Sequence, residues 1–122
     1  MNSFNYQDLD VWKKGIDIGD LIYDLTAGFG RTEKYGLGQH MRRISESIPS
    51  NIAEGAVRQY TKEYMQFCYI ALGSCAELET QVVLAGRRKL IDGKDDKELR
   101  EYLNHEIRMI RNLIKSLRKR GK

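Results

Sequence analysis

Apolar residues recur every three or four positions along four stretches of the chain, which is the spacing of one face of an α-helix. The most regular stretch predicts a helix that begins near Thr61, a candidate N-cap residue, and ends before the Asp92-Gly93 turn. Its apolar positions alternate strictly at four and three residues and are Tyr64, Cys68, Ala71, Cys75, Leu78, Val82 and Ala85. Small side chains crowd residues 71–76, so we expect this helix to make the closest helix contact in the domain.

The first apolar stretch predicts a helix over residues 8–27, ended by Gly28-Phe29-Gly30. It carries two neighbouring apolar stripes instead of one. The first stripe consists of Leu9, Trp12, Ile16, Gly19 and Tyr23, and the second consists of Val11, Ile18, Ile22 and Leu25. Because the two stripes together cover about half of the helix circumference or more, we expect this helix to touch a second buried surface besides the bundle core.

The second helix is predicted over residues 35–55, with Gly55 at or near its end. Pro49 falls inside it and removes the backbone donor that would bond the carbonyl of Ser45. We expect a kink at Pro49, with Asn51 placed to satisfy a carbonyl freed there. The helix should continue past the proline because the apolar spacing does so, through Leu37, Met41, Ile44, Ile48 and Ile52.

The fourth helix is predicted to start near Asp95, which forms a capping box with Glu98. Its core stripe is Leu99, Leu103, Ile107, Ile110, Ile114 and Leu117. Four helices joined by short connections predict an all-α, antiparallel up-down-up-down four-helix bundle, with residues 1–122 as a single domain. The composition agrees with this fold, because the chain contains one proline, 41% hydrophobic residues and 31% charged residues.

Basic residues are concentrated at the end of the chain. Residues 107–122 hold seven Lys or Arg side chains and no acid, whereas the other 106 residues hold 14 bases and 17 acids, a balance of −3. Five of the seven recur at three- and four-residue spacing along one line of the predicted helix: Arg108, Arg111, Lys115, Arg118 and Lys122. Lys119 and Arg120 add charge beside them.

Two interpretations of this basic segment remain open. Cations are favourable at the C-terminus of a helix, and a charged face is often only a solvated one. The same line of cations also suits contact with a phosphate backbone, because each neutralised phosphate releases counterions. The absence of any acid from the line distinguishes it from an ordinary solvated face, which mixes both signs.

Several features predict a cytoplasmic protein that contacts no membrane. The first eight residues lack the basic segment and apolar run of a secretory signal. The longest uncharged, mostly apolar stretch, Tyr64 to Ala76, is too short to span a bilayer. Cys68 and Cys75 are separated by about 10.5 Å of helical rise, which is too far for a disulfide, so we expect reduced thiols in the core.

The sequence offers no arrangement typical of an enzyme. Di-iron bundles use Glu-x-x-His pairs, but Leu37 precedes His40 and Tyr102 precedes His105 at that spacing. No Gly-x-Ser-x-Gly turn or phosphate-binding glycine loop is present. We therefore expect no catalytic residues, no metal, no cofactor and no small-molecule substrate.

Charged residues of the second helix have ordinary structural explanations. Arg42 lies beside Arg43 and one turn before Glu46, so an ion pair between Arg42 and Glu46 is expected. Glu54 could accept a hydrogen bond from Arg58 or from a neighbouring helix. A structural role is favoured for Asn51 and Glu54 over a functional one.

Several segments resemble a known bacterial protein family. They are Leu-Asp-Val-Trp at residues 9–12, Tyr-Gly-Leu-Gly-Gln-His-Met-Arg-Arg at 35–43, Ser-Ile-Pro-Ser-Asn-Ile-Ala-Glu-Gly at 47–55, and Ala-Leu-Gly-Ser-Cys-Ala-Glu-Leu-Glu at 71–79. They are similar to the four-helix-bundle family encoded in intervening sequences of bacterial 23S ribosomal RNA genes. The resemblance covers about Phe4 to Leu90. Gly30 departs from it, because the family commonly has a proline after the aromatic residue, and this affects the expected geometry of the first loop only.

The resemblance implies a bundle that assembles into a ring-like homopentamer and associates with RNA or the ribosome. It brings no catalytic residues, and the family's signature positions fall on Arg42, Arg43, Pro49, Asn51, Glu54 and Gly55. Since rings need a subunit interface and the first helix is apolar over a wide arc, we predict that Val11, Ile18, Ile22 and Leu25 contribute to it.

The function predicted from the sequence is a non-enzymatic oligomeric bundle that contacts RNA through the basic line of the fourth helix. The alternative is a protein-interaction or scaffolding ring with no nucleic-acid role, which would hold a partner through an apolar rim or groove.

Overall fold

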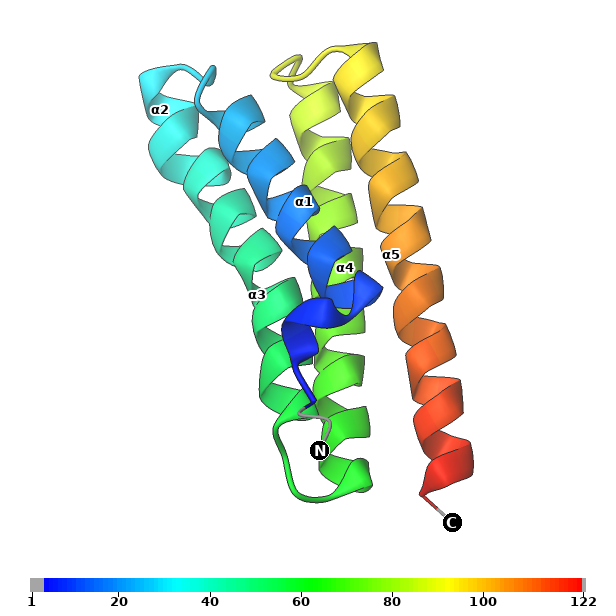
Figure 1. Ribbon diagram of the computed structural model, residues 1–122. Helices are drawn as coiled ribbons and strands as arrows, with labels where there is room; N and C mark the ends of the chain where they lie inside the picture. The colour runs from blue at the N-terminus through cyan, green and yellow to red at the C-terminus, as the bar shows by residue number, and fades with distance from the viewer. Residues whose placement is uncertain (1–3, 122) are drawn as a thin grey trace.

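The computed structural model describes residues 4–121 of the chain, and the regular structure within that range is entirely helical, with no strand. Four long helices form the molecule: α1 (Asp10–Thr26), α3 (Gln39–Ala56), α4 (Thr61–Arg87) and α5 (Gly93–Arg120). A 3-10 turn, η1 (Tyr6–Asp8), precedes α1. Helix α2 (Arg31–Glu33) and a π-helical turn, η2 (Lys34–Gly38), lead directly into α3 (Figure 1).

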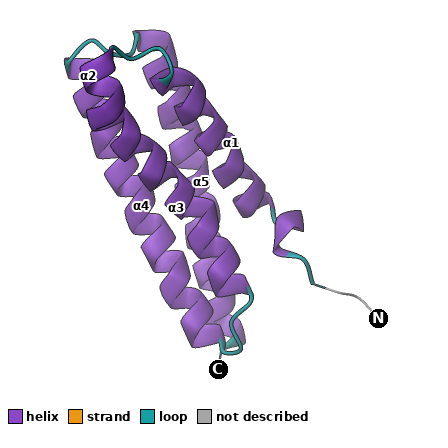
Figure 2. Cartoon of the chain, turned by 90° about the vertical axis from the view of Figure 1, so that its left-hand side faces the viewer, coloured by secondary structure: helices purple, strands orange, loops and turns teal. Residues whose placement is uncertain are grey.

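The helices form a closed bundle, as Figures 1 and 2 show. Helix α3 packs against α1 and α4, while α5 packs against α4 and α1. The connection between α3 and α4 lies at one end of the molecule, and the connections after α1 and α4 lie at the other (Figure 1).

Helix α4 has the core stripe that its spacing predicts. All seven predicted positions, from Tyr64 to Ala85, are buried. The α3–α4 contact is the most extensive in the bundle, and the Ser47 hydroxyl donates a hydrogen bond to the Ser74 hydroxyl across it at 2.7 Å. The predicted cap was wrong: Tyr60 occupies the N-cap position without a side-chain cap, and Thr61 is the first helical residue.

By length and mean hydropathy alone, α4 also qualifies as a membrane-spanning helix. The uncharged stretch from Tyr64 to Ala76, on which the sequence prediction was based, is shorter than the whole helix. In the structure, the buried residues of α4 pack against α3 and α5, and such a core helix meets the same length and hydropathy criteria.

The two stripes of α1 have exchanged roles relative to the prediction. Val11, Ile18 and Ile22 are buried in the core of this one chain, with Ile18 and Ile22 fully inaccessible, and Leu25 is half-buried. Ile18 and Ile22 therefore cannot contribute to a subunit interface. The exposed side chains instead come from the other stripe, where Ile16 and Tyr23 retain 38% and 42% of their accessible surface.

A glycine explains which stripe of α1 faces inward. A Cβ atom added at Gly15 would lie 3.1 Å from a carboxylate oxygen of Glu106 and 3.2 Å from Pro49. Neighbouring side chains therefore occupy the space beside α1 where Gly15 lacks a side chain, and Val11 and Ile18 lie on the same side as Gly15. Both stripes are apolar, so hydrophobicity alone could not choose between them.

Helix α3 continues through Pro49, as expected, and Pro49 is buried. Asn51 does bond to a carbonyl beside the proline: its side-chain amide donates to the Ser47 carbonyl at 2.7 Å. The proline frees the Ser45 carbonyl, however, so Asn51 does not compensate for it in the way expected. Gly55 lies one residue before the end of α3 and is buried against α4.

Helix α5 starts two residues earlier than predicted, and its N-cap is Asp92, whose carboxylate accepts a hydrogen bond from the Asp95 backbone N–H at 2.8 Å. The capping box at Asp95 was therefore wrong. The core stripe is correct at Leu99, Leu103, Ile110, Ile114 and Leu117. Ile107, however, is only half-buried, and Glu106 occupies the buried position in its place.

Candidate nucleic-acid interface

The basic residues of α5 lie on the outside of the bundle. Arg108, Arg111, Lys115 and Arg118 are all exposed, and we refer to these four as the basic ridge. Lys119 and Arg120 are exposed in the last turn beside it, while Lys122 lies outside the described residues. Within residues 4–121, the ion pairs join Arg58 to Glu54 and Arg100 to Asp96, so none of them neutralises the ridge.

A groove runs between the basic ridge and α4. Its volume is about 310 Å³, and Tyr69, Leu72, Arg111, Ile114, Lys115 and Arg118 line it. We call it the α4–α5 groove. Ile114 is buried and Leu72 half-buried, so aliphatic side chains underlie it. Tyr69 belongs to α4 and keeps 46% of its surface exposed.

A hydrogen bond connects the two sides of the α4–α5 groove. The Arg118 guanidinium donates from Nη2 to the Tyr69 hydroxyl oxygen at 2.6 Å. This bond fixes the hydroxyl end of the ring against α5 and leaves the other guanidinium N–H groups of Arg118 available. Three unneutralised cations beside an exposed aromatic ring form a surface that can bind a phosphate and a planar base together.

The sequence predicted the cations of this surface but not Tyr69. The ridge follows from helical spacing within one segment, whereas Tyr69 lies 49 residues away from Arg118. Tyr69 immediately follows the core residue Cys68, so the helical pattern places it beside the core stripe. The signal available was an aromatic residue at a position that the core stripe does not require.

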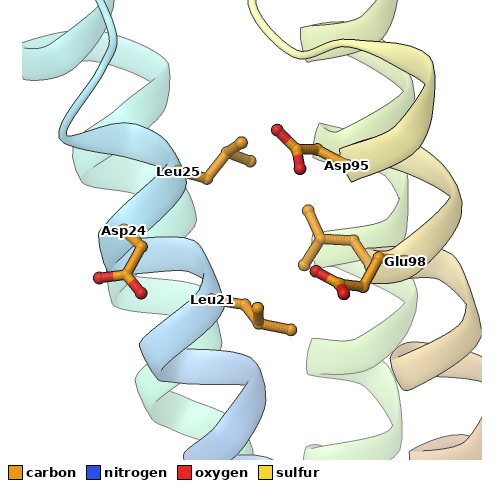
Figure 3. A pocket seen from close by; sticks show the side chains of 6 residues that line it. Leu21, Asp24, Leu25, Asp95 and Glu98 are labelled. Carbon is orange, nitrogen blue, oxygen red and sulfur yellow. The ribbon is translucent and has the colours of Figure 1, made fainter.

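A second pocket, between α1 and α5, is lined by acidic side chains instead of basic ones (Figure 3). Its volume is about 190 Å³. Figure 3 shows the carboxylates of Asp95 and Glu98 beside Leu21 and Leu25, and Asp24 and Leu99 complete the lining. Helix α5 therefore mixes acids and bases along its first half and carries cations without acids from residue 107 on, so its second half is the part that attracts a polyanion.

Arg42 serves a structural purpose between α1 and α3. Its Nε donates to the Thr26 hydroxyl at 2.8 Å, and its guanidinium lies 4.6 Å from the centre of the Tyr23 ring. The predicted ion pair with Glu46 was wrong, because Glu46 accepts a hydrogen bond from the Tyr23 hydroxyl at 2.7 Å. That bond raises the pKa of Tyr23.

The other signature positions divide into buried and exposed groups. Pro49 and Gly55 are buried at helix contacts. Glu54 is exposed and pairs with Arg58 at 3.6 Å, one of the two partners expected for it. Arg58 also lies over the Phe67 ring, 4.8 Å from its centre. Arg43 is exposed on the outer face of α3.

The most unusual titratable group is Glu106, which sequence reasoning assigned to no site. It is fully buried, and among the described residues neither carboxylate oxygen has a hydrogen-bond partner. Burial raises the pKa of Glu106 to about 8; the nearby Lys14 opposes that rise and Asp17 adds to it. The carboxyl group faces Gly15, at the point where α1 meets Pro49 of α3.

The two cysteines lie in the core, as predicted. Both are buried and free, and burial raises the pKa of each thiol to about 12. Their thiolate populations at neutral pH are therefore very small. Within residues 4–121, no group of three or more His, Cys, Asp or Glu side chains is arranged to hold a metal ion.

Two comparisons relate this chain to known proteins. The sequence profile described as "23S rRNA-intervening sequence protein" matches residues 7–112. The match extends well into α5, beyond the region of resemblance identified from the sequence motifs. No curated protein sequence matches the chain.

The comparison with solved structures identifies chains with the same fold. One of them is a protein of unknown function from the S23 ribosomal protein family of Bacteroides thetaiotaomicron. Its TM-score against this chain is 0.80 at 21% sequence identity, and the alignment covers 86% of this chain and 95% of that one. At this identity the likeness establishes the helical fold only.

Proposed function

This chain belongs to the 23S rRNA-intervening sequence protein family, and from that membership we propose a non-enzymatic helical bundle that associates with RNA or the ribosome. The basic ridge of α5 makes the contact. One observation carries the proposal: Arg108, Arg111, Lys115 and Arg118 are exposed along one line, and no described acid pairs with them. Such a line exchanges condensed counterions for protein cations when it meets a phosphate backbone.

The proposed biological unit is a ring-like homopentamer of antiparallel, up-down-up-down bundles in the cytoplasm. The positions of the connections at alternate ends support this topology (Figure 1). Exposed aliphatic side chains within the long helices support self-association, and they include Ile16 on α1 with Ile70 and Leu84 on α4. A ring would repeat the basic ridge in every subunit and so strengthen its attraction for RNA.

Charge reversal on the ridge tests the RNA contact. We expect wild-type protein to bind a structured fragment of 23S rRNA with an affinity that falls as salt rises. Replacing both Arg108 and Arg111 with Glu should weaken binding and reduce the slope of log K against log salt by roughly 1.4–1.8, since each phosphate contact contributes about 0.7–0.9. Fluorescence anisotropy over a salt series measures both quantities.

The matched control is the double variant Lys13→Glu with Lys94→Glu, which makes the same change in net charge at exposed positions away from the ridge. It should lose affinity only slightly and keep the wild-type slope. Equal losses in the two double variants would show that net charge, and not the ridge, determines binding. A flat salt dependence for the wild type would refute the RNA contact altogether.

A scaffolding ring without an RNA role is the second candidate. The observation that favours it is the outer face of α4, where Ile70 and Leu84 keep 52% and 44% of their surface exposed. This candidate would be supported over the first if the wild type captured one protein stoichiometrically and nuclease treatment did not reduce the capture. The variant with Arg108→Glu and Arg111→Glu should then capture the same amount of that protein as the wild type.

A further inference from the structure

The α4–α5 groove differs from the rest of the basic surface because it combines cations with an aromatic ring. Arg108 and Lys119 offer charge alone, which suits the phosphates of any nucleic acid. In the groove, Arg111 and Lys115 lie on one side and Tyr69 on the other. A ligand that satisfies the whole groove must carry negative charge and a flat, exposed ring.

Duplex RNA does not meet this requirement. In a helix the base faces are stacked on one another, so a protein aromatic ring has no free face to contact. Unpaired nucleotides in loops, bulges and single strands do expose their faces, and they stack on Tyr, Phe or Trp. The volume of about 310 Å³ lies at the lower end of the range for small-ligand pockets, which suits one nucleotide.

The hydrogen bond from Arg118 makes Tyr69 suitable for stacking. Because the Tyr69 hydroxyl is held at 2.6 Å from Nη2, the ring has less rotational freedom to lose when a base arrives. Leu72 and Ile114 provide apolar contact beneath the site. The cations flank it without a described ion pair, so no carboxylate must be displaced by the incoming phosphate.

From these features we propose that the α4–α5 groove binds one unpaired nucleotide of RNA, with its phosphate on Arg111 and Lys115 and its base stacked on Tyr69. The inference rests on the RNA association proposed above and specifies its substrate class. It assigns two tasks: the ridge attracts RNA of any kind, and the groove selects segments that contain an unpaired base.

The test compares a short, fluorescently labelled single-stranded RNA with the same strand annealed to its complement. Tyr69→Ala should reduce affinity for the single strand by roughly 5- to 150-fold, the range expected for loss of one base–aromatic stack. Its affinity for the duplex and its salt slope on both RNAs should match the wild type, because no phosphate contact is lost. Arg111→Gln should reduce the single-strand slope by about 0.7.

Two further variants separate stacking from folding and from the hydroxyl group. Tyr69→Phe keeps the ring and loses the bond to Arg118, so it should bind the single strand within a few-fold of wild type. Tyr35→Ala removes an exposed tyrosine elsewhere, in η2, and should have no effect on binding. Circular dichroism verifies that each variant retains its helices.

The outcomes distinguish failure of the nucleotide site from failure of the RNA association. If both RNAs bind with steep salt dependence but Tyr69→Ala binds the single strand like wild type, the nucleotide site is wrong and the ridge contact stands. If Tyr69→Ala weakens both RNAs equally, the groove does not select unpaired bases. If neither RNA binds, both the site and the RNA association fail.

Discussion

At the scale of single residues, Glu106 makes the core of this bundle sensitive to pH. Its folded pKa of about 8 lies above the ordinary value of 4.5. Between these two values the folded chain keeps a proton that the unfolded chain has released, so raising the pH favours unfolding. Its contribution to stability is complete below pH 4.5 and is lost as the pH rises to about 8.

Glu106→Gln should remove this dependence. The wild type should lose about 1.4 kcal/mol of unfolding free energy per pH unit within that window, relative to the variant. Urea denaturation of both proteins over a pH series measures the difference between their unfolding free energies. The contributions of other titrating groups largely cancel in this difference. Glu101→Gln changes an exposed residue on the same helix, and its unfolding free energy should vary with pH as that of the wild type does. If the unfolding free energies of Glu106→Gln and the wild type varied with pH in parallel, the raised pKa of Glu106 would be contradicted.

The burial of Glu106 could not be predicted from the sequence, and single residues explain why. Ile107 has the hydrophobic side chain, so the pattern placed it in the core, yet the structure leaves it half-buried and buries its neighbour. Space decides this position, because the missing Cβ of Gly15 allows the Glu106 carboxyl group to lie against α1. The spacing of apolar residues along one helix shows which side chains favour burial, but it does not show where a neighbouring helix leaves space for a polar one.

At the scale of elements, Gly55 determines how closely α3 approaches α4. An added Cβ would lie 2.8 Å from Cβ of Phe67 and 3.2 Å from the Tyr64 backbone oxygen. Gly55→Ala should therefore destabilise the bundle by about 1–3 kcal/mol through overpacking, despite the better helix propensity of alanine. Thermal denaturation followed by circular dichroism measures the loss.

Gly73→Ala is the matched control for this prediction. Gly73 lies inside α4, and nothing is within 4 Å of an added Cβ. Alanine there should raise stability by up to about 1 kcal/mol. If both variants shifted the midpoint in the same direction, helix propensity and not the α3–α4 contact would control the effect.

Some elements could be predicted in detail and others could not. The stripe of α4 was correct at every position, and its strict four- and three-residue spacing runs through most of the helix. Helix α1 has two such stripes, and only its packing on α3 and α5 selects the one with Val11 and Ile18. The basic ridge could be predicted within one helix, but Tyr69 joins it only because α4 packs against α5.

At the scale of the whole molecule, the apolar surface left outside the bundle predicts self-association. Light scattering at micromolar concentration should give a mass several times the 14.2 kDa of one chain. Ile70→Glu with Leu84→Glu should reduce that mass if the outer face of α4 makes the contact, and Ile16→Glu should do so if α1 makes it. A stable wild-type monomer would exclude the ring.

The two buried thiols have a practical consequence for measuring motion. A thiol reagent can modify Cys68 or Cys75 only during moments when α4 separates from its neighbours, since both side chains are fully inaccessible in the closed bundle. The labelling rate of each cysteine therefore reports the free energy of local opening around it. Because the two residues are about two helical turns apart, single-cysteine variants can show whether the bundle opens from one end or all at once.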